Sequence, residues 1–135
     1  MRNFLLTLMF DGSAYHGWQV QSNAVTVQET LQDALERILG TRYPVTGCSR
    51  TDSGVHALEF CCNVRAETAL CPERLSAALN AVLPRDIAVR SLWVFTRAMI
   101  ASAKHISISF GTERRAIPFT SGAHTFIPMC WMRLF

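Results

Sequence analysis

The sequence predicts an α+β domain, in which one antiparallel sheet of four strands carries two helices on one face. Three observations predict it. Hydrophobic and polar residues alternate over 3–10 and 58–65, as in half-buried strands. Hydrophobic residues recur every three or four positions over 27–38 and 75–82, as in amphipathic helices. Two further β-like stretches complete the order β-α-β-β-α-β, which is the ferredoxin-like arrangement.

The first strand is predicted over residues 3–10, and it ends at Asp11. It places four hydrophobic side chains on one face: Phe4, Leu6, Leu8 and Phe10. The segment that follows, 15–23, is polar and aromatic without a period. Three of its rings either stack on bases or cover the edge of the core: Tyr15, His16 and Trp18.

The first helix has recognisable boundaries at both ends. Thr26 and Glu29 match a capping box, in which each side chain accepts a hydrogen bond from the other residue's backbone amide. Gly40 suits the left-handed conformation that stops a helix. The stripe expected to face the core consists of Val27, Leu31, Ala34, Leu35 and Ile38.

The second half of the domain places a helix between strands. Residues 43–48 are predicted as a short strand and residues 58–65 as a half-buried one. Pro72 opens a second helix in its first turn and Pro84 ends it. The buried face of that helix is expected to consist of Leu75, Ala78, Leu79 and Val82. Residues 87–95 form the last strand.

Length and hydrophobicity limit the class of protein. A chain of 135 residues, half of them hydrophobic, is long enough to bury the core of one domain. It contains no run of about 18 apolar residues, so we expect no membrane span. Its first residues, Met-Arg-Asn and then a strand-like run, lack the features of a signal peptide. We therefore expect a cytoplasmic protein.

The five cysteines favour neither a disulfide framework nor a zinc site. Their number is odd and no two of them form a C-x-x-C pair: Cys48, Cys61, Cys62, Cys71 and Cys130. Cys61 and Cys62 are adjacent in a strand, so their side chains point to opposite faces and cannot chelate one ion. We expect reduced, mostly buried thiols and no bound metal.

Net charge does not by itself identify a partner. The formal charge of the chain is +3. Residues 1–92 hold eight Arg and nine acidic residues, whereas residues 93–135 hold four Arg, one Lys and one Glu. The basic excess lies in the second part, so a nucleic-acid partner for the predicted domain cannot be argued from charge.

Polar chemistry is concentrated in residues 47–57, between two predicted strands. This stretch contains a carboxylate, a guanidinium, three hydroxyls, an imidazole and two glycines. Connectors between scaffold elements are frequent locations of functional sites. The alternative is a solvated turn, because Asp-Ser-Gly is common in turns.

A resemblance to a known family bears on that choice. Residues 49–57 read Ser-Arg-Thr-Asp-Ser-Gly-Val-His-Ala and resemble the catalytic loop of the TruA family of tRNA pseudouridine synthases. Residues 10–19 resemble that family's first-strand exit, and residues 27–31 the start of its first helix. Residues 79–87 resemble its second helix and next strand. These motifs occur in family order over about the first 90 residues.

The resemblance implies that Asp52 is the catalytic carboxylate, acting either as nucleophile on the ribose or as base at a ribose proton. It implies substrate-binding roles for neighbouring residues and for one residue after the first strand: Arg50, Thr51, Ser53, Gly54 and Gln19. Arg50 keeps Asp52 ionised, holds a phosphate, or forms a structural salt bridge. Gly54 admits the nucleotide or simply makes the turn.

Two other polar residues near the loop have simpler expected roles. His56 is expected to pack or form hydrogen bonds rather than act as an acid, and Asp11 to form a turn. The pseudouridine synthase reaction that the resemblance implies needs no cofactor, metal or external oxidant.

The resemblance also implies a substrate and partners. The reaction would convert uridine to pseudouridine at positions 38 to 40 in the anticodon stem-loop of tRNA. The target base must first be flipped out of its stack, at a cost of a few kcal/mol. Family members resemble one another in stacking that base on a tyrosine and in using basic residues from the second half of the chain. They also resemble one another in forming homodimers that hold tRNA across both subunits. Without that tyrosine and domain, this chain is expected to be weakly active or inactive.

The family pattern stops near residue 93, so we expect a catalytic-loop domain over 1–93 and an irregular, poorly ordered tail over 94–135. The family would continue with Phe-His-Ala-Arg and then Lys-x-Tyr-x-Tyr, whereas residues 95–100 read Phe-Thr-Arg-Ala-Met-Ile. Codons can be assigned to residues 94–101 so that the same bases, regrouped from the last base of the first codon, spell Phe-His-Ala-Arg-Tyr-Asp-Cys. This predicts a frameshift between about Val89 and Phe95; the alternative is a divergent C-terminus.

Two other functions fit the same sequence. One is a non-catalytic RNA-binding module of ferredoxin-like fold, which would stack bases on sheet aromatics. Phe4 and Phe60 are the candidates for that role, but both lie on the apolar faces of their strands and are better explained as core. The other is a fragment that only dimerises or aggregates through exposed apolar surface.

Overall fold

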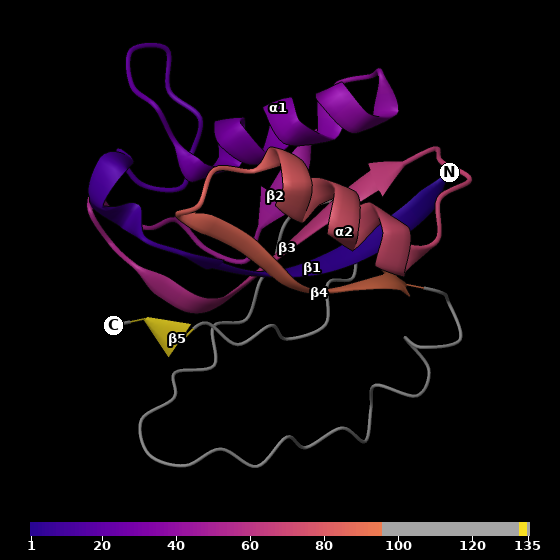
Figure 1. Cartoon of the computed structure of the whole chain (residues 1–135). Coiled ribbons are helices and arrows are strands. Elements are labelled where there is room, and N and C mark those ends of the chain that lie inside the picture. Colours follow the sequence, from indigo (N-terminus) through magenta and orange to yellow (C-terminus); the bar gives the residue numbers. More distant parts are fainter. Residues whose placement is uncertain (96–132, 135) are drawn as a thin grey trace.

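A computed structural model of the chain describes residues 1–95 and 133–134. The elements run β1 (Arg2–Phe10), a 3₁₀ turn (Gly12–Ala14), α1 (Val27–Leu39), β2 (Val45–Gly47), β3 (Ala57–Ala66), α2 (Pro72–Val82), β4 (Ile87–Phe95) and β5 (Arg133–Leu134) (Figure 1). The first six strands and helices follow the predicted order. The predicted α+β, ferredoxin-like fold class is therefore confirmed.

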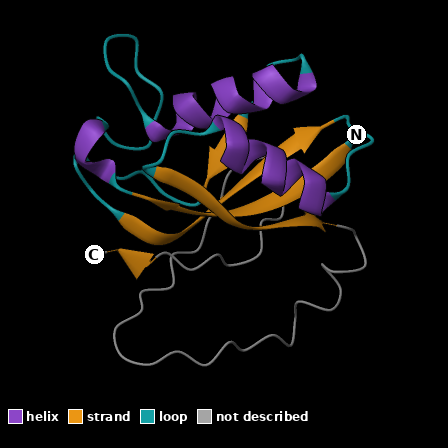
Figure 2. Ribbon diagram, in the orientation of Figure 1, coloured by secondary structure: helices purple, strands orange, loops and turns teal. Residues whose placement is uncertain are grey.

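The sheet has the strand order β2-β3-β1-β4, and every neighbouring pair is antiparallel. Leu6 at the centre of β1 lies opposite Cys62 of β3 and Leu92 of β4. These three residues therefore share one face of the sheet. Both helices cover one face of the sheet, as Figure 2 shows.

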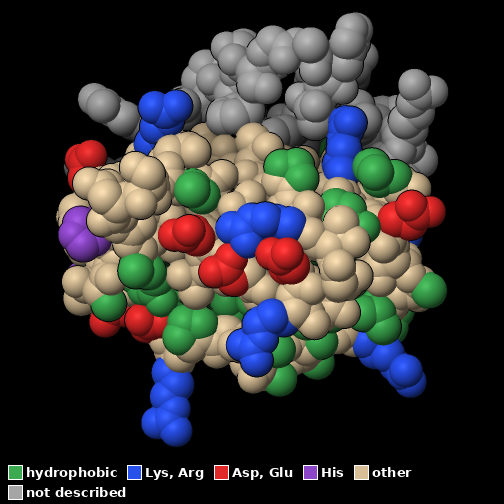
Figure 3. Space-filling model, turned by 90° about the horizontal axis from the view of Figure 1, so that it is seen from above, with side chains coloured by type: hydrophobic (Ala, Val, Ile, Leu, Met, Phe, Trp, Pro, Cys, Tyr) green, Lys and Arg blue, Asp and Glu red, His purple; other side chains and the backbone are tan. Residues whose placement is uncertain are grey.

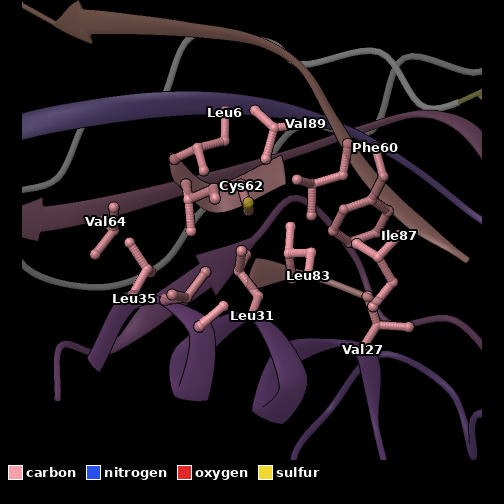
Figure 4. Packing of buried hydrophobic residues seen from close by; sticks show 14 of the residues in the cluster. Leu6, Val27, Leu31, Leu35, Phe60, Cys62, Val64, Leu83, Ile87 and Val89 are labelled. Atoms are coloured by element: carbon pink, nitrogen blue, oxygen red, sulfur yellow. The ribbon is translucent and has the colours of Figure 1, made fainter. Parts of the chain in front are cut away.

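The core fills the space between that face and the helices. The four predicted side chains of β1 are at most 3% exposed. Leu31 and Leu35 of α1 point toward Cys62 and Val64 of β3 in Figure 4. Phe4 and Phe60 have no exposed surface, so both rings belong to the core as expected and neither can receive a base.

The helix boundaries follow the predicted signals, except that only one of the two hydrogen bonds of the capping box is found among the described residues. Thr26 Oγ1 accepts a hydrogen bond from the Glu29 amide at 3.4 Å, which is the first half of the expected capping box. The Thr26 carbonyl also accepts bonds from the amide and the hydroxyl of Thr30. Gly40 ends α1 at φ 73°, and Pro72 opens α2.

Two expectations about the second half were wrong in detail. The strand expected over 43–48 is limited to Val45–Gly47, because Pro44 has no amide to donate and the chain bends after Gly47. The cysteines differ as well: Cys48, Cys62 and Cys71 are free, but Cys71 is exposed and Cys61 takes part in a disulfide. The expectation that all thiols are reduced therefore fails at Cys61.

The tail predictions lie almost wholly outside the described residues. Val94 and Phe95 complete β4. Arg133 and Leu134 form the two-residue strand β5, which pairs with β3 at Ala57 and Glu59 and which the sequence pattern did not predict. Residues 96–132 and 135 are not described, and the expected tail and its reading frame remain predictions.

Gln28 joins α1 to the rest of the domain. Its side chain is buried, donates to the Val45 carbonyl at 2.7 Å and accepts from the Val20 amide at 2.9 Å. The Gln28 amide donates to the Trp18 carbonyl at 3.1 Å. One residue thus connects the helix, β2 and the segment that precedes the helix.

We predict that Gln28→Ala lowers the free energy of unfolding by about 2 kcal/mol, because it strands a buried carbonyl and an amide without partners. Gln32→Ala on the same helix, where the side chain is only half-buried, is the matched control and should cost less than about 0.5 kcal/mol. Urea unfolding followed by circular dichroism measures both. Equal losses in the two variants would contradict the role assigned to Gln28.

Candidate active site

The loop with concentrated polar residues lies at one end of the sheet, between β2 and β3. β2 ends at Gly47, opposite Cys62, and the Cys48 amide still donates to the Cys61 carbonyl at 2.9 Å. The chain then leaves the sheet and returns at Ala57, which lies opposite Phe10 at the end of β1. The register of β1 and β3 therefore places residues 48–56 beside the segment that leaves β1.

That segment, residues 11–18, holds the loop by backbone hydrogen bonds. The Trp18 amide donates to the Thr51 carbonyl at 3.3 Å, and the Gly54 amide donates to the Tyr15 carbonyl at 3.2 Å. The Ser53 hydroxyl donates to the same Tyr15 carbonyl at 3.4 Å. Within the loop, the Val55 amide donates to the Asp52 carbonyl at 3.3 Å and closes a turn. The backbone around Asp52 is thus fixed on both sides.

Two glycines make this close approach possible. A Cβ on Gly12 would overlap the carbonyl oxygen of Val55. A Cβ on Gly17 would overlap the carbonyl oxygen of Thr51, and Gly17 also has φ +81°, where other residues are strained. Both positions therefore require glycine for the loop to lie where it does.

Two buried aromatic side chains fix the segment 11–18 to the core of the domain. Trp18 is 1% exposed, and its ring lies 4.3 Å from that of Phe60, centroid to centroid. Tyr15 is 5% exposed and donates to the Asp86 carboxylate at 2.8 Å. Of the two readings of these rings, covering the core edge is the one that the structure supports for Tyr15 and Trp18, while His16 is exposed.

The predicted catalytic and binding residues lie together on or beside the loop. Four of their side chains are exposed: Asp52, Arg50, Ser53 and Gln19. Within the part of the chain that the structure describes, neither Asp52 nor Arg50 forms an ion pair. Among residues 1–95 and 133–134 the structural salt bridge considered for Arg50 is therefore not formed, and both side chains are exposed.

Thr51 and Gly54 differ from those four. Thr51 is half-buried, and its Oγ1 is inaccessible and has no hydrogen-bond partner among the described residues. Gly54 has φ +79° with open space where a Cβ would be, so the turn conformation requires glycine and the space beside it is unfilled. Gln19 directly follows Trp18, whose amide bonds to Thr51, so it extends from the edge of the loop.

One contact at the site was not predicted. His56 Nδ1 accepts a hydrogen bond from the Gly12 amide at 3.1 Å and lies 2.9 Å from Asp11 Oδ1. Asp11 caps the 3₁₀ turn, and its bonds from the Ser13 hydroxyl and amide, with a smaller contribution from His56, lower its pKa. His56 is a hydrogen-bonding residue and Asp11 a turn residue, as expected, but their pairing was missed.

A pocket of about 400 Å³ lies next to this pair, within the range typical of ligand sites. Its apolar lining comes mainly from the face of the sheet that the helices do not cover, and its polar lining from the strand ends. The lining residues are Met9, Phe10, Asp11, His56, Ala57, Leu58, Arg85, Asp86 and Ala88. An apolar floor with a polar rim suits a flat polar ring such as a nucleobase.

The opposite, helix-covered face shows mixed charge. Acidic and basic side chains are interspersed over it in Figure 3, and Arg42 pairs there with Asp33 and Glu36 of α1. The described residues on this face form no basic patch of the kind that attracts nucleic acid. Among the described residues there is no group of three potential metal ligands, and no helix is long and apolar enough to cross a membrane.

We predict that Gly17→Ala destabilises the chain by about 2 kcal/mol more than Gly40→Ala. Both substitutions impose a left-handed backbone on alanine, at a cost of about 1 to 2 kcal/mol each. Only at Gly17 does the new Cβ meet a backbone carbonyl, since nothing lies within 4 Å of that position at Gly40. Denaturant unfolding compares them; equal losses would show that the loop does not press on Gly17.

We also predict a fall in stability above about pH 10 that depends on Tyr15. Burial, and next the hydrogen bond to Asp86, raise the pKa of Tyr15 above its ordinary value. A raised pKa in the folded state stabilises the protein below the unfolded pKa of about 10, and this contribution is lost as the pH rises further. Unfolding at pH 9 and pH 11 should show a smaller loss for Tyr15→Phe than for the parent chain. An equal loss would exclude this contribution.

Comparison with known proteins gives the family. The sequence profile of the tRNA pseudouridine synthase family matches residues 7–93, which is more than half of the chain and includes the whole loop. The chain is 51% identical over 89 residues to tRNA pseudouridine synthase A of Thermoanaerobacter sp. strain X514, covering 66% of this chain and 36% of that protein.

Two more relatives agree. The enzyme of the same name from Clostridium acetobutylicum is 51% identical over 87 residues, or 64% of this chain and 36% of the relative. That from Aquifex aeolicus is 49% identical over 89 residues, or 66% and 37%. The chain thus spans little more than a third of the length of these relatives. On the match over residues 7–93, the chain belongs to the tRNA pseudouridine synthase family.

Proposed function

We propose that this chain provides the catalytic-loop domain of a tRNA pseudouridine synthase, with Asp52 as the catalytic carboxylate. One observation carries the proposal: Asp52 is exposed on a loop whose backbone is fixed by the segment 11–18, within the matched region. A carboxylate that is solvent-accessible but precisely held is what attack on, or proton removal from, a bound sugar requires. The proposed substrate is uridine at positions 38 to 40 of the tRNA anticodon stem-loop.

The reaction is an isomerisation. The bond between the ribose C1′ and the uracil N1 breaks, the base turns, and a bond forms between C1′ and the uracil C5, while the proton on C5 is lost and N1 gains one. No atom enters or leaves overall, so no cofactor is required. Asp52 acts either by adding to the sugar and leaving again, or by taking and returning a ribose proton.

The neighbouring residues would hold the RNA. Arg50 has its guanidinium exposed and without an ion pair among the described residues, so it can bind a phosphate by two parallel hydrogen bonds. Ser53, next to Asp52 in the loop, and Gln19, at the edge of the loop, offer further exposed polar groups. The open space beside Gly54 admits a nucleotide. The Thr51 hydroxyl is inaccessible and unpaired among the described residues, so it would act on RNA only indirectly, by holding the loop through an ordered water.

The domain is proposed to work with partners that residues 1–93 do not supply. Residues 94–135 contain no Lys-x-Tyr-x-Tyr sequence, which carries the base-stacking tyrosine in the family that the loop resembles. We propose a catalytic-loop domain over 1–93, followed by a tail that does not replace the family's second domain. A homodimer that binds tRNA across both subunits, in the cytoplasm, is part of the same proposal.

We predict little or no pseudouridine formation by the 135-residue chain on anticodon-arm tRNA. We predict full turnover by a chimera in which residues 1–93 replace the matching part of the Thermoanaerobacter enzyme, because this domain then regains its partners. In that chimera Asp52→Asn should lower kcat at least about 100-fold and leave tRNA binding within about twofold. Glu67→Gln, an exposed acidic residue away from the loop, is the matched control. Tritium release from uridine labelled at C5 measures turnover.

Two outcomes would contradict the proposal. Turnover by the 135-residue chain at the rate of the chimera would show that no further domain is needed. Turnover by the Asp52→Asn chimera at the parent rate would remove Asp52 from the chemistry. If that variant also binds tRNA normally, a non-catalytic RNA-binding role for this domain becomes the better explanation.

A further inference from the structure

We propose that His56 is a positioning residue for the Asp52 loop, and that protonation of its imidazole exchanges a contact with the Gly12 amide for one with the Asp11 carboxylate. The effect on turnover rests on the function proposed above, whereas the exchange of contacts does not. His56 begins the return of the loop into β3, four residues after Asp52, and β3 itself begins at Ala57. It is therefore placed to fix the outgoing end of the loop.

The two contacts exclude each other. His56 Nδ1 lies 3.1 Å from the Gly12 amide nitrogen and 2.9 Å from Asp11 Oδ1. A ring nitrogen offers either one lone pair or one N–H. The neutral ring with its proton on Nε2 accepts from Gly12, and its lone pair then faces the carboxylate. The protonated ring donates to Asp11 and can no longer accept from Gly12.

The charges around His56 favour such an exchange. Asp11 is held in place by its two bonds from Ser13, which also lower its pKa, so the carboxylate is ionised when the imidazole gains a proton. Two more charged residues, Arg85 and Asp86, line the same pocket from the segment before β4. Asp86 accepts a bond from Tyr15, and Arg85 is exposed. Among the described residues, Asp11 is the carboxylate that forms an ion pair with the His56 ring nitrogen.

The position of Gly12 affects the conformation of the loop because the Gly12 backbone lies in close contact with the Val55 carbonyl. A Cβ there would overlap the Val55 carbonyl, and the Val55 amide bonds to the Asp52 carbonyl. At the other end of the loop, Trp18 holds Thr51. The loop is thus held on both sides of Asp52. Before Asp52, the Trp18 amide bonds to Thr51; after it, Tyr15 bonds to Gly54 and the Gly12 amide bonds to His56. The Gly12–His56 contact is called the second clamp below. Without the His56 contact, the printed bonds that tie residues 53–56 to the segment 11–18 within the described part of the chain are those of Ser53 and Gly54 to the Tyr15 carbonyl.

The exchange can be observed directly in the 135-residue chain. Ring nitrogen chemical shifts of His56 and the Gly12 amide shift are measured by NMR from pH 8 to pH 5. We expect an unprotonated Nδ1 at pH 8, and a change of the Gly12 amide that coincides with protonation of His56. In Asp11→Asn the carboxylate that the protonated ring would bond to is gone, so the Gly12 amide should lose its bond on protonation without an ion pair forming at residue 11. A Gly12 amide that ignores protonation of His56, or an Nδ1 that carries the proton at pH 8, overturns the exchange.

The positioning function is tested by amide exchange in the same chain. His56→Ala should raise the hydrogen-exchange rate of the Gly54 amide at least about tenfold, because its bond to Tyr15 loses the support of the second clamp. The Gly40 amide, bonded to Glu36 at the end of α1, is the internal control and should change less than twofold. His56→Asn can still accept from Gly12 and should keep Gly54 protected. Equal changes at Gly54 and Gly40, or none at Gly54, overturn the proposal.

Turnover is then measured in the chimera. His56→Ala should lower kcat by about 10- to 100-fold with KM within about twofold, and His56→Asn should restore most of kcat and weaken its dependence on pH between 5 and 8. An unchanged kcat for His56→Ala, with Asp52→Asn inactive, overturns the positioning function and leaves the proposed reaction standing. Activity retained by Asp52→Asn refutes the reaction instead, while the amide measurements still decide whether His56 positions the loop.

Discussion

The structure depends on the close contact between two backbone segments at one end of the sheet. β1 and β3 pair until Phe10 meets Ala57, so the chain that leaves β1 and the loop that enters β3 must share the same space. Gly12 and Gly17 let carbonyl groups of Val55 and Thr51 approach where any side chain would intervene. This contact converts a polar connector, which would otherwise be mobile, into a fixed support for one exposed carboxylate.

The supporting segment is itself fixed by the core, which links stability to the site. Trp18 packs on Phe60, and its backbone carbonyl accepts from Gln28 of α1, while Tyr15 reaches Asp86 before β4. The rings that precede the loop are therefore structural, and the exposed groups on the loop are left for a ligand. Arg50 and Asp52 face solvent without ion-pair partners among the described residues, so both charges are available to bind RNA.

Much of this could be predicted from sequence because it has local causes. Period and capping residues predicted β1, β3 and both helices, and Gly40 ends α1 as its type suggests. The loop was found from its motif. The Asp11–His56 pair was missed because its members are distant in sequence, although the register of the two alternating strands would have placed them together. The contacts of Gly12 and Gly17 could not be inferred from the sequence, because a glycine in a sequence does not show which neighbouring atoms occupy the space of its missing side chain.

In the proposed enzyme, the segment after β1 holds Asp52 in its reactive position. The most direct test is the turnover of the chimera with Gly12→Ala, compared with Gly40→Ala as a glycine remote from the loop. We expect kcat to fall at least tenfold for Gly12→Ala at temperatures where the protein remains folded, with tRNA affinity unchanged. Gly40→Ala should keep the parent activity. Parent kcat in a folded Gly12→Ala variant would contradict this role of the segment.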